Sequence, residues 1–424
     1  MISEKGKVLL IVNNFKFCVA NTLKDGQVRW RCTNKSSKCP SKLYTAVGND
    51  SVVLNSSLNH NHAEDEHLER QIISNGAKIK AVSDLHEKPA KVIHKELREV
   101  GAAFNTITSH DINLIRHNIY VTKRNQLPSL PKQLSEVFAS LEELAPKTNQ
   151  EEPFLLVNNK EKNIVVFSCY RNLHFLSSLD TVYMDGTFNF CPKFFKQFFT
   201  IHGLKNGHYT PLVFCLLTNK YQITYETLFA MIISKCKEYN VNFDPKNVVV
   251  DYELAIHNAV IKTWSKVDII GCGFHLVQAW YRKIQSLGLT EQYKQNTEIG
   301  KFLKYFFGLQ FLNPEDVGDC FTFDLACDMP DNDKLQKFSD YLIENYISED
   351  SVFPPHVWAS LNSSLSRTTN ACESFHSRFN KSFYCPHPNI FAFLDVLLNF
   401  QNEVYIQINS SNKYVKALKN TILF

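Results

Sequence analysis

Residues 179–189 have the sequence Leu179-Asp180-Thr181-Val182-Tyr183-Met184-Asp185-Gly186-Thr187-Phe188-Asn189. A short apolar, β-prone run ends there on Asp185, and a glycine follows at once, which is how an α/β sheet offers a carboxylate at a strand end. The pattern returns at Val248-Val249-Val250-Asp251, just before a helix-like run. A third acid, Glu373, lies in the helical segment 368–376. Two acids on strand ends and one on a helix predict a cage for two divalent metal ions.

Phosphoryl transfer is the chemistry that such a cage serves. Charge builds on the attacking and leaving oxygens, and two ions about 3.5–4 Å apart stabilise both. Hard Mg²⁺ prefers carboxylate oxygens, and Mn²⁺ accepts the same ligands. In this interpretation Asp185 bridges both ions, Asp251 holds one and Glu373 holds the other. A strand that ends in aspartate is common, so helix-capping or surface acids are the alternative.

Periodicity around these acids predicts a mixed sheet flanked by helices over residues 151–424. Strands are expected at 163–169, 181–184, 198–204, 210–218, 247–250 and 268–271, and helices at 225–239, 253–264, 274–287 and 369–380. A mostly helical insertion at about 288–366 separates the last strand from the helix of Glu373.

The N-terminal 68 residues predict a small β-rich module. Alternating runs indicate strands at 7–13, 15–21, 27–32, 41–46 and 51–54. Cys32, Cys39, His60 and His62 supply four nitrogen and sulfur ligands of the kind that tetrahedral zinc takes. A module of this size has little core, and a structural metal adds folding energy. The alternative is a chance pair of cysteines beside a polar loop.

Residues 69–150 predict a helical connector with helices at 66–84, 89–100, 109–121 and 134–144. Its basic residues make it a candidate helix-turn-helix on DNA, and a plain connector is the alternative.

Charge and composition indicate which partners and which cellular compartment to expect. The formal net charge is +4, but residues 1–62 hold nine Lys or Arg and three Asp or Glu. This basic end is expected to meet phosphates, or else it is a solvated surface. No apolar run reaches the length of a membrane span, so we expect no membrane partner. Twelve cysteines in a large chain without a signal peptide indicate metal ligands or buried thiols in an intracellular protein.

One resemblance covers the N-terminal module. Phe15, Phe17, Trp30-Arg31-Cys32, Cys39 and His60-Asn61-His62 follow in an order that resembles the FLYWCH-type zinc finger. The resemblance implies that Cys32, Cys39, His60 and His62 are the ligands of a structural Zn²⁺. It also implies that the module binds DNA or protein partners.

A second resemblance covers roughly residues 160–400. Tyr183 to Phe188, Val250 to Ala255, Gly271-Cys272-Gly273-Phe274-His275 and Asn370 to His376 occur in the order of the Mutator-like (MULE) transposase domain. That family implies a ribonuclease-H-like fold, a multidomain α+β and α/β chain, and a nuclear protein. It implies that Asp185, Asp251 and Glu373 form a DDE triad for Mg²⁺- or Mn²⁺-dependent DNA strand cleavage and strand transfer. The family also leads us to expect a homodimer on DNA. It places His275 beside the active site, where it is expected to orient a phosphate or a leaving oxygen; Cys272 and His376 are weaker candidates.

The sequence departs from the family pattern in one respect, and a non-catalytic interpretation therefore stays open. Many such transposases continue into a Cys/His-rich SWIM zinc motif, and none follows Glu373 in this sequence. The rival is a domesticated, non-catalytic zinc-finger regulator that binds DNA. A ribonuclease-H-like nuclease on RNA–DNA hybrids is a third interpretation, which fits the triad but not the finger.

Overall fold

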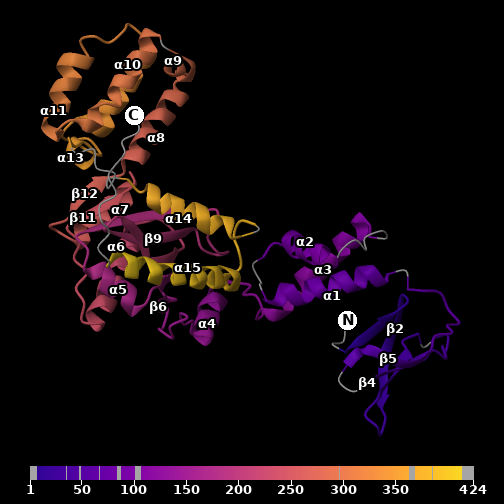
Figure 1. Ribbon diagram of the computed structural model, residues 1–424. Coiled ribbons are helices and arrows are strands. Elements are labelled where there is room, and N and C mark those ends of the chain that lie inside the picture. Colours follow the sequence, from indigo (N-terminus) through magenta and orange to yellow (C-terminus); the bar gives the residue numbers. More distant parts are fainter. Residues whose placement is uncertain are drawn as a thin grey trace. The chain divides into compact units, whose positions relative to one another are not determined.

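The computed structural model describes residues 7–34, 36–46, 49–65, 67–83, 87–100, 107–295, 297–361, 368–383 and 385–412, with the backbone alone for 49–54. The chain divides into two compact units, residues 1–130 and 131–424. Each unit has its own sheet (Figure 1). The finer boundaries expected after residues 68 and 150 stay predictions.

A five-stranded antiparallel meander begins the first unit. Its strands follow chain order, and they are β1 (Leu9–Val12), β2 (Phe15–Thr22), β3 (Val28–Cys32), β4 (Lys42–Ala46) and β5 (Asn49–Ser57). Alternation along the strands buries Phe17, Trp30 and Leu43 on one face. The Trp30 indole donates to Thr45 Oγ1 at 3.0 Å, which satisfies its buried N–H. So small a core makes metal ligation valuable to this sheet.

Three helices complete the first unit: α1 (Leu68–Ser83), α2 (Pro89–Val100) and α3 (Ser109–Gln126). Their apolar faces meet in a core that includes Ile73, Val92 and Ile115. A capping box begins α3, because Thr108 accepts from the amide of Asp111 and the Asp111 carboxylate accepts from the amide of Thr108. α1 and α2 match the expected segments closely, whereas α3 begins at the expected residue and continues beyond the expected end at residue 121 to Gln126.

A seven-stranded mixed sheet forms the centre of the second unit. Across the sheet the order is β12 (Asp268–Gly271), β11 (Asn247–Val250), β8 (Thr181–Thr187), β9 (Gln197–Lys205), β10 (His208–Leu217), β7 (Ile164–Phe167) and β6 (Leu155–Asn159). The strands β8, β11 and β12 are parallel, and the remaining neighbours are antiparallel. The C-terminal ends of β8 and β11 therefore lie side by side.

Helices cover this sheet: α4 (Leu134–Leu144), α5 (Tyr170–Ser177), α6 (Gln222–Glu238), α7 (Leu254–Thr263), α14 (Asn370–Lys381) and α15 (Ile390–Ser411). Figure 1 shows α14 and α15, in yellow, beside the sheet. Aromatic packing fixes them there: the Phe198 ring of β9 lies 4.9 Å from Phe379 of α14 and 5.0 Å from Phe393 of α15, centroid to centroid. This packing places the first turn of α14 over β8.

A helical insertion follows β12. It begins with α8 (Gly273–Ser286), and it continues with α9 (Thr290–Lys294), α10 (Glu298–Phe306), η1 (Leu309–Phe311), α11 (Pro314–Asp319), η2 (Cys320–Leu325), α12 (Asp333–Leu342), η3 (Ile343–Ile347) and α13 (Pro355–Trp358). Its core is separate from the sheet and surrounds Trp280 of α8. Trp280 and Trp358 lie 5.5 Å apart, edge to face.

The mixed α/β architecture predicted from the sequence is confirmed, with a β-rich N-terminal region ahead of a helical and mixed-sheet region. One strand differs from the prediction. β8 was expected to end at Met184, but it continues to Thr187 because its pairing with β9 continues that far. Asp185 therefore lies inside the strand. None of the helices that the structure describes is both long and apolar enough to cross a membrane.

Candidate functional site

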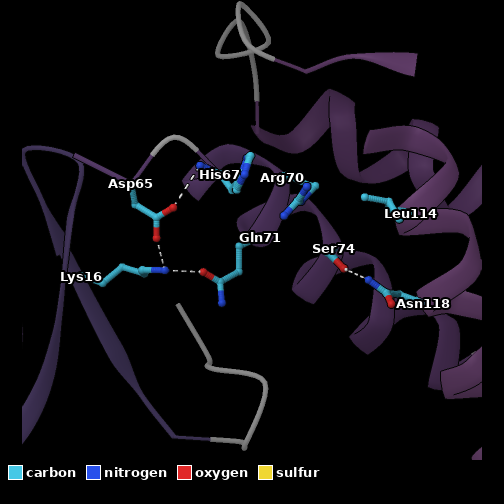
Figure 2. Close-up of a pocket in the computed structure, with 8 residues that line it drawn as sticks. All are labelled: Lys16, Asp65, His67, Arg70, Gln71, Ser74, Leu114 and Asn118. Atoms are coloured by element: carbon cyan, nitrogen blue, oxygen red, sulfur yellow. Dashed lines mark hydrogen bonds and ion pairs between the residues drawn. The ribbon is translucent and has the colours of Figure 1, made fainter. Parts of the chain in front are cut away.

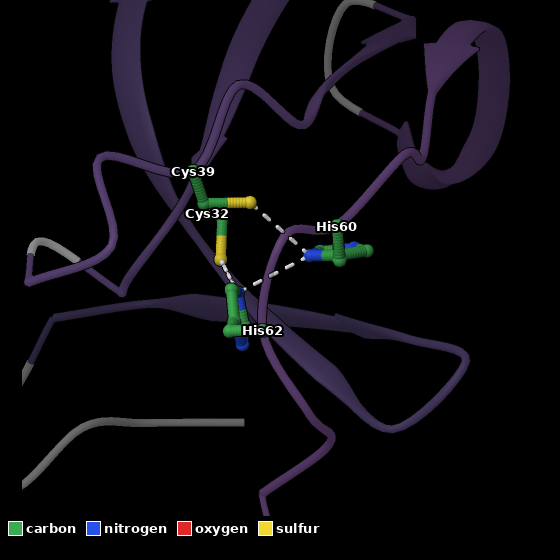
Figure 3. Close-up of side chains that lie close together, drawn as sticks. All are labelled: Cys32, Cys39, His60 and His62. Carbon is green, nitrogen blue, oxygen red and sulfur yellow. Dashed lines mark hydrogen bonds between the residues drawn. The ribbon is translucent and has the colours of Figure 1, made fainter.

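The four predicted zinc ligands lie together at one end of the N-terminal sheet (Figure 3). Cys32 ends β3, Cys39 precedes β4, and His60 and His62 follow β5. Their ligand atoms all lie within 4.8 Å of one another. Cys32 Sγ is 3.2 Å from His62 Nε2, Cys39 Sγ is 3.3 Å from His60 Nδ1, and the two nitrogens are 3.4 Å apart.

These separations fit a tetrahedral zinc ion. Zn–S bonds of about 2.3 Å and Zn–N bonds of about 2.0–2.1 Å place sulfur and nitrogen about 3.5 Å apart, and two nitrogens about 3.3 Å apart. His62 Nδ1 donates to the Ala63 carbonyl at 2.8 Å, which leaves Nε2 free to bind metal. The Phe15 ring stacks on His60 at 3.5 Å and holds that ring in place. The donor set supports Zn²⁺.

Cys39 is prepared for metal binding by its neighbours. Burial raises the pKa of its thiol, but hydrogen bonds with Ser41 and Asn61 outweigh burial and lower it to about 6. The thiolate is the form that binds zinc. The lowered pKa of Cys39 favours its thiolate form, whereas burial raises the pKa of the neighbouring Cys32.

A polar hollow of about 310 Å³ lies between β2 and the helices α1 and α3 (Figure 2). Lys16 contacts Asp65 and donates to Gln71 Oε1 at 2.7 Å. Arg70 pairs with Asp111 at 3.2 Å. Each cation in the hollow already has a carboxylate partner, so the hollow links the finger to the helices and is not an anion site.

The second site lies at the C-terminal ends of the parallel strands. β11 pairs with β8 at a constant spacing of 66 positions, and Asp185 and Asp251 have that same spacing. Asp251 directly follows β11, so extending this register beyond its last pair, Val249 with Tyr183, brings Asp251 opposite Asp185 on the neighbouring strand. Cys272, directly after β12, continues the row by the same reasoning. Asp185 is 8% exposed, so its carboxylate is nearly enclosed.

The helix α14 brings Glu373 to this row. Cys372 is fully buried between Tyr183 of β8 and Val249 of β11, which fixes the first turn of the helix over both strands. Glu373 Oε1 is 3.1 Å from His275 Nε2 of α8. Its pKa is raised by burial, and the charge of Asp185 raises it further. The Glu373 carboxylate is therefore near enough to Asp185 to interact with its charge.

The carboxylates of Asp185, Asp251 and Glu253 lie close enough together for their negative charges to repel one another. Burial raises the pKa of Asp251 to about 6, and the charges of Glu253 and Asp185 add to the rise. For His275, burial opposes protonation, but the hydrogen bond with Cys272 and the carboxylates of Asp185 and Asp251 raise its pKa to about 9. A protonated His275 would carry a positive charge that offsets part of the repulsion between the neighbouring carboxylates.

The acids do not form a ready-made metal cage. Among the described residues, only the four zinc ligands form a group of three or more Cys, His, Asp or Glu ligand atoms close enough to hold one ion. Instead, Glu373 pairs with His275 and Asp185 pairs with His376. The donor types fit Mg²⁺ or Mn²⁺, and each paired carboxylate has a second oxygen to offer an ion.

A buried relay ends on Asp185. His376 Nδ1 lies 3.0 Å from Asp185 Oδ2, and His376 Nε2 lies 3.0 Å from Thr200 Oγ1. His202 Nε2 lies 2.8 Å from the same hydroxyl. Every atom is satisfied if His202 donates to Thr200, Thr200 to His376, and His376 to Asp185. The relay holds Asp185 in one orientation.

Sequence reasoning missed Thr200 and His202. Both are polar residues at positions i and i+2 of the mostly apolar strand β9, and both are fully buried. Two polar residues at positions i and i+2 of a buried strand are the signal that would have found them. His376, in contrast, was expected beside Glu373, and it lies there.

Cys272 joins the starts of two helices. It directly precedes α8, and its sulfur accepts from the amide of Thr369 at 3.2 Å and from its hydroxyl at 3.1 Å. Thr369 directly precedes α14. This contact ties the helix of Glu373 to the helix of His275 across the whole insertion.

The two sites and the fold define a protein with a zinc-finger-type Cys/His site in its first unit and a cluster of carboxylates and histidines beside the mixed sheet of its second unit. Residues 181–279 match the model of the MULE transposase domain, and residues 1–62 match that of the FLYWCH zinc finger domain. No curated protein matches the chain. Both resemblances are therefore confirmed, and they support a transposase-related, DNA-binding protein. Asp185, Asp251 and His275 lie within the first match, and Glu373 lies beyond it.

Proposed function

We propose that the second unit cleaves and joins DNA strands in a reaction that depends on Mg²⁺ or Mn²⁺, with Asp185, Asp251 and Glu373 as the DDE triad. The observation that supports the proposal is the parallel register of β8 and β11, because its extension to the strand ends brings Asp185 and Asp251 to neighbouring positions, and Cys372, next to Glu373 in the chain, packs on both strands. The match of residues 181–279 to the MULE transposase domain supports it. The sheet order supports the ribonuclease-H-like fold, because an antiparallel run β8–β9–β10 is followed by two strands parallel to β8.

Each residue has a role in this proposal. Asp185, Asp251 and Glu373 would hold the ions through their carboxylate oxygens. Bound ions would activate the attacking oxygen and stabilise the charge that develops on the phosphate. His275 is positioned to orient a phosphate or the leaving oxygen. Carboxylates that now pair with histidines would exchange those contacts for metal contacts.

Two displacements make up the reaction. A water oxygen attacks a phosphodiester phosphorus, and the bond to the 3′ oxygen breaks, which leaves a 3′-hydroxyl and a 5′-phosphate. The freed 3′-hydroxyl then attacks a target phosphodiester, and a second P–O bond breaks as the new one forms. The zinc finger would bring the chain to its DNA ends or to protein partners. We expect this work in the nucleus, and a homodimer would hold paired ends.

The test is nicking of supercoiled plasmid by the zinc-loaded full chain in Mn²⁺ or Mg²⁺. Asp251→Asn removes a triad carboxylate at nearly constant shape. Asp180→Asn is the matched control. Asp180 is exposed, directly precedes β8, and pairs with Lys246, which directly precedes β11. We expect nicking by wild type and by Asp180→Asn, and none by Asp251→Asn.

A non-catalytic DNA-binding regulator is the second candidate. The observation that favours it is the pairing of Asp185 and Glu373 with histidines in place of a tight set of acids. Equal nicking by wild type and Asp251→Asn, or none by either while DNA binding persists, would replace the transposase proposal with the regulator.

A further inference from the structure

The N-terminal sheet has a second face, opposite its small core. Because Trp30 and Leu43 point into the core, strand alternation places Arg29 and Arg31 of β3 and Lys42 of β4 on the other face. We call this surface the outer face of the finger. Two rows of residues cross it in register, Cys18–Arg31–Lys42–Ser57 and Asn21–Arg29–Tyr44–Asn55. Neither row contains an acid.

Arg31 and Lys42 are direct cross-strand partners. Like charges placed opposite each other destabilise a sheet. No carboxylate that the structure describes forms an ion pair with Arg29, Arg31 or Lys42. The Nε of Arg29 is buried and has no hydrogen-bond partner in the described residues.

Other cations of the same unit are treated differently. Lys16, Arg70, Lys80 and Lys95 all pair with carboxylates. The outer face differs from these positions because three cations, Arg29, Arg31 and Lys42, lie on adjacent strands with no carboxylate partner among the residues that the structure describes, and an external anion would offset their charge.

We propose that the outer face of the finger binds the sugar–phosphate backbone of duplex DNA. The proposal deepens the function above, since it rests on the chain acting on DNA. Cross-strand side chains stand about 4.5–5.5 Å apart, so the long side chains of Arg31 and Lys42 can reach neighbouring phosphates of one strand. Tyr44 and Asn55 add hydrogen-bond donors in the next row. Zinc binding at Cys32 fixes the end of β3, and with it the position of Arg31.

The experiment measures binding of a labelled, mixed-sequence duplex DNA by the zinc-loaded full chain between about 50 mM and about 200 mM salt. The variants are Arg31→Gln, Lys42→Gln and their double. Lys91→Gln is the matched control, because Lys91 is an exposed lysine of α2 in the same unit. Zinc content and thermal melting check the fold of each variant.

We expect each single variant to lower the slope of log K against log salt by about 1, the double variant by about 2, and Lys91→Gln to leave it unchanged. Arg31→Lys keeps the charge and should keep the slope, which covers the case in which the double variant does not fold.

Two results would overturn the assignment. One is wild-type binding with a slope that neither Arg31→Gln nor Lys42→Gln changes; DNA binding would then stand and the outer face would not be its site. The other is tighter, equally Arg31-dependent binding of a single-stranded RNA of the same length. Absence of DNA binding by wild type at any salt would instead remove the proposed function itself.

Discussion

Asp251→Asn should stabilise the second unit at neutral pH when no Mg²⁺ or Mn²⁺ is added. The folded protein raises the pKa of Asp251 from its ordinary 3.8 to about 6 through burial and the charge of Glu253. A raised folded-state pKa favours folding only while the carboxyl group is protonated. The contribution is therefore fully present below about pH 4 and is lost as the pH rises through about 6. At about 1.4 kcal/mol for each pKa unit, the ionised carboxylate costs up to about 3 kcal/mol at pH 7.

Urea unfolding of the zinc-loaded full chain from pH 4 to pH 7 measures this cost. Three tryptophans, Trp264, Trp280 and Trp358, report on the second unit, and Trp30 reports on the first. Wild type and Asp251→Asn should be equally stable at the acid end. The variant should become more stable by up to about 3 kcal/mol at pH 7. Asp180→Asn, which removes an exposed ion pair, should change stability by less than about 1 kcal/mol at any pH. A variant that is no more stable than wild type at pH 7 would refute the view that burial and the neighbouring carboxylates make the ionised form of Asp251 costly.

Three further predictions address the zinc site, the α3 cap and the buried relay. Cys39→Ser should lose the zinc and expose Trp30, seen as loss of metal content and a red-shifted emission, whereas Cys18→Ser, outside the ligand set, should keep both; retained zinc in Cys39→Ser would disprove the site. Thr108→Ala should destabilise the first unit by about 1 kcal/mol in thermal melts, against no change in Ser109→Ala, and equal melting of the two would remove the capping box from the account. Thr200→Val should cost about 2–4 kcal/mol in urea unfolding, because two buried histidine nitrogens lose their partner; a loss under about 0.5 kcal/mol would mean that the relay is not formed.

Much of the local structure follows from the sequence because the hydrophobic periodicity and the turn residues indicate the same element boundaries. All five strands of the finger and the helices at 89–100 and 134–144 lie close to where alternation and helical spacing put them. The zinc ligands were found because four residues of the right chemistry share one short module, where few other partners exist. Trp264 and Trp280 lie in the core, as apolar periodicity predicts.

Long-range pairing is what the sequence alone could not supply. The short strand β6 and the helix α5 escaped notice because each is too brief for a clear period. The relay through Thr200 joins residues 176 positions apart, and the contact of Cys272 with Thr369 spans 97. Such contacts depend on strand order and on the way α14 packs over the sheet. For the same reason, the pairing of Asp185 and Glu373 with histidines became visible only in the folded chain.

Binding of Mn²⁺ to the zinc-loaded full chain tests the central claim most directly. Mn²⁺ seeks carboxylate oxygens and leaves the thiolate site to zinc, so paramagnetic resonance of free Mn²⁺ in a titration counts ions at the acid cluster. The account predicts binding by wild type and by Asp180→Asn, and loss of that binding in Asp185→Asn and in Glu373→Gln. Equal Mn²⁺ binding by all four proteins would contradict it, because the ion would then be held somewhere other than beside Asp185 and Glu373.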